Sequence, residues 1–431
     1  MDKGKEKTEE AWVNSFIERT QSIGSRPSQI DPCTICRVPR SIRQGDPDAY
    51  EPQIVSIGPY HRANQSLLAM EEYKWQHLNA LLSRDHDHSL RDYINEIQQL
   101  VDWARCCYSE NIKFSNEEFV EMMVLDGCFI IELFLNIDGK RAVDEMGPIY
   151  STKWMVALIG QDMLLLENQL PFFILQHLFD LLNRSNSSSL VDLALNFFAY
   201  VLPRNQEIRP SKVVHHDHLL HLFHSHVIPT PRVGPTTTFD HGSPSLTRSI
   251  PSITEIQQAG IRLKKKAGNF LDVTYQKGEI QIPTLSIYDS ITKTLFRNMI
   301  AFEQCHPKSG SYFTSYAIFM YCILETTKDV TVLKQNRIIE HWLGDDQEVV
   351  HLFKRMCQGL TVDFNDNYLL GMINHVSEFC NSKWNAWWAT LKRVYFGNPW
   401  SVFQVEVTIF TLVFTMVQAF LAIMTYYRPR A

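Results

Sequence analysis

The sequence predicts a mainly α-helical fold: a large helical globular domain with a small β-hairpin, followed by one C-terminal transmembrane helix. Through most of the 431 residues, apolar side chains recur every three or four positions, which is the period of an amphipathic helix. Residues 270–288 instead alternate apolar and polar side chains around Lys277-Gly278, as a hairpin does. Residues 407–427 carry no charge and span about 31 Å as a helix, roughly one hydrocarbon core.

The composition is that of a large helical body rather than a nucleic-acid binder. With 45 % hydrophobic residues the chain can bury a substantial core, and we expect one large domain plus the anchor. A net charge of −6 supplies no basic stripe for nucleic acid. The nine cysteines are odd in number and several lie in apolar helical patterns, which indicates reduced thiols. The N-terminus lacks the apolar stretch of a secretory signal, so we expect the body to face the cytosol.

The body begins with an irregular segment, and helical patterns follow it. Residues 1–30 are predicted to be a charged tail, and the helical domain is predicted to span residues 31–398. Residues 31–61 are rich in proline and glycine, but they are apolar enough to pack on the helices. Beyond them, six residues at helical spacing predict one apolar stripe: Leu90, Ile94, Ile97, Val101, Ala104 and Tyr108.

The next helices have recognisable starts. Ser115 with Glu118 forms a capping box before the apolar run 119–135. A second helix is predicted over residues 152–167. Pro171 then stands at the first turn of a third helix, where its missing N–H costs nothing.

Residues 203–251 are predicted to be a flexible surface insertion, because they contain seven prolines and little periodicity. The histidine-rich segment 215–226 lies within this insertion. On a helix His218 and His221 would share a face, but no cysteine or carboxylate at metal-site spacing accompanies them. We therefore expect a polar linker, with no metal and no cofactor, and the alternative of a zinc site is the less favoured one.

The second half of the body is predicted from similar signals. Ser252 with Glu255 forms a capping box before a helix over residues 253–266. In the hairpin that follows, Pro283 cannot donate to a ladder, so its strand should lie at an edge or end there. Four more helices are predicted, at 289–304, 312–327, 330–342 and 346–358, the last one capped by Asp345.

The C-terminal segment has the framing of a membrane span. Trp400 precedes it, and Tyr427, Arg428 and Arg430 close it, in the aromatic and cationic pattern of a bilayer interface. We therefore predict a transmembrane anchor over residues 400–427, with the lipid bilayer as a partner. The flanking charges are balanced, so neither the orientation nor the choice between plasma membrane and endomembrane follows from them.

A polar stripe runs along this predicted span. Because small and hydrogen-bonding side chains mediate helix packing in membranes, the stripe predicts a homo-oligomer or a partner helix. The alternative is that each threonine bonds only to its own helix backbone. Six residues lie on this face, which is about 100° wide: Gln404, Thr408, Thr411, Thr415, Gln418 and Thr425.

The irregular N-terminal segment supplies a candidate recognition loop. Loops on a rigid scaffold often carry binding residues, and this one contains Arg37, Tyr50, Ser56 and His61. The structural alternative, which we favour, is that Gly58-Pro59 enforces a turn while the tyrosines fill the core.

No catalytic site is predicted. The sequence contains no G-x-S-x-G, no phosphate-binding glycine loop and no H-E-x-x-H. The pair Cys33 and Cys36 lacks the strand-to-helix setting of a redox motif. Glu132, Glu167 and Glu303 lie in or beside apolar runs, where they are expected to bond neighbouring backbone rather than to act as paired carboxylates.

Several phrases of the sequence are specific when taken together. They are Ile35–Pro39, Ala49–Pro52, Val55–His61, Met70-Glu71 with Lys74, Asp126–Glu132, Asp162–Pro171, Arg297–Cys305 and Tyr395–Trp400. With the terminal span, they resemble the plant family called domain of unknown function 247, also known as uncharacterised protein family 0481. The resemblance covers about residues 33–427.

The resemblance implies a land-plant protein that is mostly helical and ends in one membrane helix. Some grass members of the family are linked genetically to self-incompatibility, which points to recognition or signalling. The family has no established catalytic residues, so none is transferred to this chain. We therefore expect a membrane-anchored module that binds an unknown protein partner; the alternative is a membrane-associated enzyme of unrecognised type.

Overall fold

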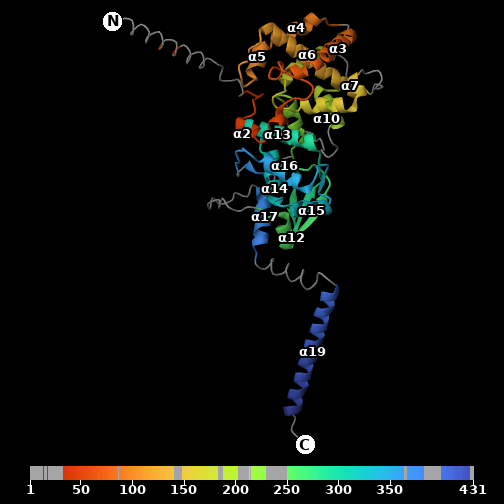
Figure 1. The fold of residues 1–431 in the computed structure, drawn as a ribbon, viewed down its shortest axis with the longest axis vertical. Helices are drawn as coiled ribbons and strands as arrows, with labels where there is room; N and C mark the ends of the chain where they lie inside the picture. The colour runs from red at the N-terminus through yellow and green to blue at the C-terminus, as the bar shows by residue number, and fades with distance from the viewer. Residues whose placement is uncertain are drawn as a thin grey trace, which may run out of the picture. The chain divides into compact units, whose positions relative to one another are not determined.

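The computed structural model describes the fold for most of the chain (Figure 1). The described residues are Val13, Ile17, 33–85, 87–139, 148–182, 188–201, 213, 215–229, 250–363, 366–382 and 399–427. Helices predominate, strands are few and short, and a long apolar helix comes last. The predicted fold class is therefore confirmed.

The chain forms two compact units, each built from segments that are separated in the sequence. Unit 1 comprises Met1–Val38, Pro52–Phe197 and His215–Leu222, and unit 2 comprises Pro39–Glu51, Phe198–Val214 and Phe223–Ala431. A compact unit need not fold by itself, so the single domain predicted over 31–398 stays a prediction.

Unit 1 is organised around helix α6 (Asn116–Asp138), which packs against α3, α4 and α9. Side chains all round α6 are buried, as expected for a helix that is apolar on every face. The Ser115–Glu118 capping box is confirmed. The other helices of this part are α3 (Ala69–Arg84), α4 (Leu90–Gln98), α5 (Val101–Cys106), α7 (Pro148–Ser151), α8 (Lys153–Asp162), α9 (Phe172–Leu182) and α10 (Leu190–Val201), with a 3-10 turn at Gln65–Leu67.

Two predictions in unit 1 need correction. The stripe predicted over residues 90–108 is divided between α4 and α5 instead of forming one helix. The helix predicted over 152–167 ends at Asp162, because the next residues form a turn held by their own side chains. The predicted start of a helix after Pro171 is confirmed by α9.

Helix α11 (Leu219–Val227) lies inside the insertion that was predicted to be flexible. Its leucines and phenylalanine are buried, and so are His218, His224 and His226. The loop prediction is therefore wrong for residues 219–227, because the apolar side chains between the histidines recur at helical spacing and are buried. Most of the remaining insertion lies outside the described residues.

Unit 2 combines helices with two small sheets. In the three-stranded sheet the order is β1-β3-β2, with β1 parallel and β2 antiparallel to β3, and β4 pairs with β5 in parallel. The strands are β1 (Arg262–Lys266), β2 (Thr274–Gln276), β3 (Glu279–Pro283), β4 (Leu285–Ile287) and β5 (Ile339–His341). The helices are α2 (Arg40–Arg43), α12 (Ile253–Gln258), α13 (Asp289–Cys305), α14 (Tyr312–Ile323), α15 (Thr327–Gln335), α16 (Asp346–Met356), α17 (Leu370–Asn381) and α19 (Pro399–Tyr427), with 3-10 turns at Pro47–Tyr50 and Pro307–Ser309.

The predicted hairpin is confirmed as β2 and β3. Lys277 and Gly278 both have positive φ, 50° and 76°, as the tight turn between twisted strands requires. Pro283 ends β3, although β3 is the central strand rather than an edge.

Two predicted helices in unit 2 are wrong in part. The helix predicted over 253–266 stops at Gln258, and after Gly260, whose φ is 96°, the chain becomes strand β1. The helix predicted over 330–342 likewise stops at Gln335, and β5 follows. Both segments pair with strands distant in the sequence, which a local pattern does not reveal. The capping box at Ser252 and the cap at Asp345 are confirmed.

Candidate functional site

The irregular N-terminal segment is held by a turn at residues 162–171. Asp162, at the end of α8, accepts backbone N–H bonds from Gln53 at 2.9 Å, Ile54 at 2.7 Å and Val55 at 2.9 Å. Burial of this carboxyl raises its pKa to about 6, and the three N–H donors oppose that rise. The segment is thus fixed by one side chain over three successive residues.

Side chains of the same turn complete the attachment. Asn168 accepts a hydrogen bond from the Ile57 N–H at 2.7 Å and donates to the Val55 carbonyl at 3.0 Å. Gln169 donates to the carbonyls of Met163 and Leu165, both at 2.7 Å. The turn is thus held by hydrogen bonds from its own side chains.

Glu167 binds Arg37 and Val38, which are the last two residues of the first segment of unit 1. Its Oε2 accepts from Arg37 Nη1 at 2.7 Å, and its Oε1 accepts from the Val38 N–H at 2.7 Å. The Arg37 guanidinium also lies 4.1 Å from the centre of the Tyr60 ring, in cation–π geometry. The Glu167 carboxylate is buried, whereas the Arg37 side chain is 36 % exposed and also bonds to Glu110 at 3.2 Å.

The candidate recognition loop is mostly buried. Tyr50, Ser56 and His61 are 0 %, 2 % and 6 % exposed, and only Arg37 among the four has substantial exposure. Tyr50 also belongs to unit 2, whereas the other three belong to unit 1. A recognition role for these four residues stays a prediction, and their burial leaves Arg37 as the side chain that a partner can reach.

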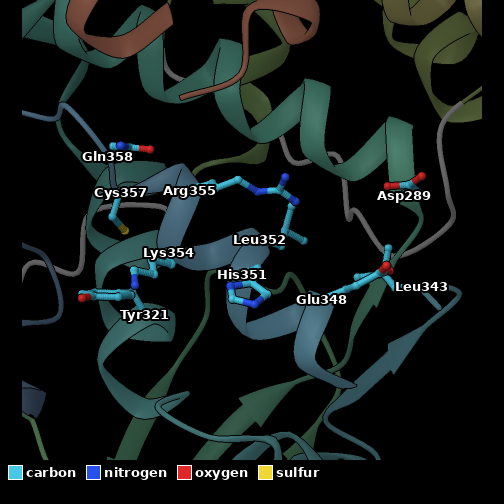
Figure 2. Close-up of a pocket in the computed structure, with 10 residues that line it drawn as sticks. All are labelled: Asp289, Tyr321, Leu343, Glu348, His351, Leu352, Lys354, Arg355, Cys357 and Gln358. Atoms are coloured by element: carbon cyan, nitrogen blue, oxygen red, sulfur yellow. The ribbon is translucent and has the colours of Figure 1, made fainter. Parts of the chain in front are cut away.

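A cavity of about 790 Å³ in unit 2 is mixed in charge (Figure 2). Asp289 at the start of α13 and Tyr321 on α14 lie on its wall, and α16 with the residues around it supplies the rest. The full lining is Asp289, Tyr321, Leu343, Glu348, His351, Leu352, Lys354, Arg355, Cys357 and Gln358.

The cavity combines cations, carboxylates and one weakly nucleophilic thiol. Lys354 and Arg355 lie in the last turn of α16, where cations also complement the helix dipole. Burial raises the pKa of the Cys357 thiol to about 12, so the thiol stays protonated and is a weak nucleophile at neutral pH. Glu348 is bonded to the backbone N–H of Gly344 at 2.8 Å, which holds the start of α16.

Unit 1 carries a second, apolar depression of about 330 Å³ between helices, which we call the α3–α4–α6 groove. Its lining is Trp75 and Leu78 of α3; Leu90, Ile94 and Gln98 of α4; Val101 of α5; and Asn116, Glu117, Val120, Glu121, Val124 and Leu125 of α6. The polar members are exposed at the rim and the α6 aliphatic side chains are buried at the floor. Sequence reasoning missed this groove, because the exposure of Leu90 and Ile94 depends on how α4 sits on α6.

The thiols and histidines that invited a metal or redox reading have ordinary structural contacts. Cys33 and Cys36 have their sulfurs 3.8 Å apart, and burial raises the Cys33 pKa to about 11, which makes this thiol unreactive. His218 Nε2 lies 3.1 Å from the Thr34 carbonyl, and His224 Nε2 lies 2.9 Å from Glu303 Oε1. Across the part of the chain that the structure describes, no three His, Cys, Asp or Glu side chains are grouped to hold a metal ion.

Helix α19 carries the predicted polar stripe. Within it the threonine hydroxyls donate to carbonyls one turn earlier: Thr408 to Gln404 at 2.7 Å, and Thr415 to Thr411. These bonds correspond to the alternative in which each threonine bonds to its own helix backbone. The other long polar side chains of this face are Gln404 and Gln418, which are exposed. A packing role for the stripe stays a prediction.

Relatives of this chain are plant proteins. The family model described as a plant protein of unknown function, DUF247, matches residues 35–414. A UPF0481 protein of Arabidopsis thaliana is 31 % identical over 419 residues, covering 91 % of this chain and 87 % of the relative. A putative UPF0481 protein of the same plant is 23 % identical over 480 residues, covering 90 % and 89 %. No solved structure matches significantly. The chain belongs to the DUF247 family of plant proteins of unknown function.

Proposed function

We propose that this protein is a single-pass membrane protein whose helical body recognises a protein partner at the membrane surface. The observation that carries the proposal is the segment Glu406–Met424 of α19, with a mean hydropathy of 2.2 and no part of it buried in the structure. It is the one helix among the described residues that is long and apolar enough to cross a bilayer. Left in water, its side chains would expose a continuous apolar surface, and a bilayer removes that cost.

The backbone of α19 is also suited to a hydrocarbon environment. Backbone groups inside a helix are paired within the segment, as lipid requires. The hydroxyls of Thr408 and Thr411 donate to carbonyls of the same helix, so they too are satisfied without water.

The recognition part of the proposal is supported by the α3–α4–α6 groove. Trp75 is 47 % exposed, and Leu90 and Ile94 are each 37 % exposed. An apolar groove with a polar rim is the shape that an amphipathic helix binds. A partner helix bound in such a groove gains affinity from apolar contacts alone, so this function needs no reactive group. The family likewise has no assigned catalytic residues.

Membrane fractionation tests the anchor. The full chain is expressed in plant cells, and the pellet after ultracentrifugation is washed with alkaline carbonate. Phe414→Arg with Val417→Arg should move the protein to the supernatant, because each arginine near the centre of a span costs about 2.5–3.5 kcal/mol. Trp154→Arg with Tyr200→Arg, at exposed body positions, is the matched control and should stay in the pellet. A wild-type chain that is soluble after lysis would refute the anchor.

An enzyme acting at the membrane is the second candidate, and the cavity of Figure 2 is the observation that favours it. If it holds, full-length protein should convert a component of a plant metabolite extract, as followed by mass spectrometry. His351→Ala with Lys354→Ala should then abolish the conversion. Absence of conversion by the wild-type protein would leave the recognition module as the favoured function.

A further inference from the structure

Strand β1 gives the three-stranded sheet of unit 2 a basic edge. Residues 260–278 carry five cations and one aspartate, although the net charge of the whole chain is −6. The strand order β1-β3-β2 places β1 on the outside of the sheet. Because the lysine run is a strand and not the predicted helix, its pairing with β3 decides which way the lysines face.

The pairing with β3 leaves two of these lysines open to solvent. One face of β3 is fully buried through Ile280 and Ile282. Lys264 pairs with Gln281, which lies between them, so its side chain is on the opposite face. Lys265 pairs with Ile282 but is exposed as well, as the edge of a sheet allows. Both ammonium groups can therefore reach a ligand outside the unit.

Two of the five cations have partners within unit 2. Arg262 pairs with Glu279 at 2.8 Å, and Lys266 donates to the Asp272 carbonyl at 3.3 Å. The other three are exposed and form no ion pair with any residue that the structure describes. We call them the β1 basic patch: Lys264, Lys265 and Lys277.

Lys277 is brought to β1 by the turn that it occupies between β2 and β3. The carbonyl of the next residue, Gly278, accepts a hydrogen bond from the Arg262 N–H at 3.0 Å. Arg262 begins β1, two positions before Lys264. Three positive charges on one part of a sheet repel one another, and an anionic surface relieves that repulsion.

The sheet is also close in sequence to the proposed membrane span. Helix α17 packs against β2, and it is the last helix described before α19. The seventeen peptide units from Ser382, after α17, to Pro399, where α19 begins, reach at most about 60 Å when extended. A tether of this length holds the patch near the bilayer at a high effective concentration, so a weak attraction is sufficient.

We propose that the β1 basic patch binds anionic lipid headgroups of the membrane that α19 crosses. Each lysine near an anionic leaflet raises the association constant about fivefold, and exposed lysines without ion pairs lose no internal partner when they bind. The inference rests on the proposed function, because the anchor is what holds the patch at a bilayer. It adds the part of unit 2 that faces the lipid and the class of lipid that it contacts.

Lysine labelling of the full chain tests this contact. The protein is reconstituted in nanodiscs of phosphatidylcholine alone or mixed with phosphatidylglycerol, which is anionic and has no amine. Exposed amines are acetylated with an N-hydroxysuccinimide ester, and the rate at each lysine is measured by mass spectrometry. The patch lysines should react at least about threefold more slowly in the anionic nanodiscs. Lys113, an exposed lysine of unit 1, should react equally in both.

Salt and a charge variant show whether the protection is electrostatic. It should disappear at about 1 M salt, where the screening length is about 3 Å. Lys264→Gln with Lys265→Gln changes two exposed positions and removes most of the patch charge, so Lys277 should then react at the same rate in both nanodiscs. Lys113→Gln is the matched control and should keep the protection of Lys277.

Equal rates at the patch lysines in the two nanodiscs would overturn the proposal. That result is expected if these lysines only discourage the edge strand from pairing with another chain. Protection that survives high salt, or protection of Lys277 that survives the double variant, would overturn it too. Each of these results leaves the anchor intact, because the chain has entered the nanodisc. A chain that does not co-purify with nanodiscs would instead refute the anchor, and this inference with it.

Discussion

Lys74 and Asp126 form an ion pair that is wholly buried in unit 1, with Lys74 Nζ 2.6 Å from Asp126 Oδ1. The ammonium also donates to the Ser56 carbonyl at 2.5 Å and to Glu71 at 2.7 Å. Asp126 Oδ2 accepts from the Gly58 N–H at 2.9 Å. One charged pair therefore ties α3 and α6 to the irregular N-terminal segment, and every charge in it has a partner.

Removing the cation alone should be strongly destabilising. Lys74→Met leaves the buried Asp126 carboxylate with Arg62 alone, whose Nη1 lies 3.4 Å from Asp126 Oδ1, and we expect a loss of about 3–5 kcal/mol in the free energy of unfolding. Urea denaturation of the full chain in detergent, followed by circular dichroism, measures it. Arg43→Met, which breaks the more exposed Arg43–Glu51 pair, is the control and should cost at most about 1 kcal/mol. Equal losses for the two variants would contradict the role of burial.

Asp162 should make stability depend on pH in an unusual direction for an aspartate. Burial raises its pKa in the folded state to about 6, whereas the unfolded value is about 3.9. Between these values the folded state holds the proton that the unfolded state has lost. The stability that this group contributes is therefore complete below about pH 4 and is lost as the pH rises to 6, by about 3 kcal/mol.

Asp162→Asn isolates this effect, because the amide does not titrate. The free energy of unfolding of both proteins is measured by denaturation at pH 4, 5, 6 and 7. The wild-type value minus the variant value should fall across this range by about 3 kcal/mol. A difference that stays constant with pH would show that the carboxyl titrates alike in the folded and unfolded chains.

Gly58 should tolerate no side chain. Its φ is 71°, and a Cβ there would lie 2.5 Å from the Gln169 carbonyl oxygen. Gly278 has a similar φ of 76° with nothing within 4 Å of the added carbon, so Gly278→Ala reports the backbone cost alone. We expect Gly58→Ala to be more destabilising than Gly278→Ala by about 1–3 kcal/mol in the same denaturation assay. Similar costs would mean that the turn can move away from its neighbour.

The polar face of α19 should mediate association in the membrane. Leucine at four of its positions removes both glutamine amides and two threonine hydroxyls. Each interhelical hydrogen bond contributes about 0.6–2 kcal/mol, so the dimerisation constant should fall at least about tenfold. Resonance energy transfer between labelled chains in liposomes measures the dimer. The changes are Gln404→Leu, Thr411→Leu, Thr415→Leu and Gln418→Leu.

The matched control places leucine on another side of the same helix. Phe403→Leu, Phe410→Leu and Phe414→Leu keep the span apolar and leave the polar face intact, so dimer stability should be unchanged. Loss of association in the control, or none in the polar-face variant, would refute packing through this face.

Local signals predicted those parts of the fold whose physics is local. The Ser115 capping box, the Lys277-Gly278 turn and the start of α9 after Pro171 each depend on residues within a few positions of one another. Strands β1 and β5 were missed because a strand without a pairing partner has no distinctive local pattern. The triple-lysine strand β1 exists because it pairs in parallel with β3, seventeen residues further along the chain at each register position.

The candidate surfaces show the same division. The apolar stripe around Leu90 and Ile94 was visible in the sequence, but the groove depends on how α3 and α4 pack on α6. Ser56 and His61 were placed in a candidate recognition loop because their segment is irregular. Both are buried, and the backbone on either side of Ser56 is held by Asp162 and Asn168, which lie more than a hundred residues away in the sequence and accept hydrogen bonds from Val55 and Ile57.

By itself the sequence determined the helical class, the caps, the hairpin and an apolar C-terminal helix long enough for a bilayer, because spacing and composition act over short distances. Tertiary structure alone decided which irregular residues are buried, where charged pairs such as Lys74 and Asp126 meet, and where apolar side chains are left uncovered. Those outcomes depend on contacts between distant segments, whose free energy is gained only when the helices have packed.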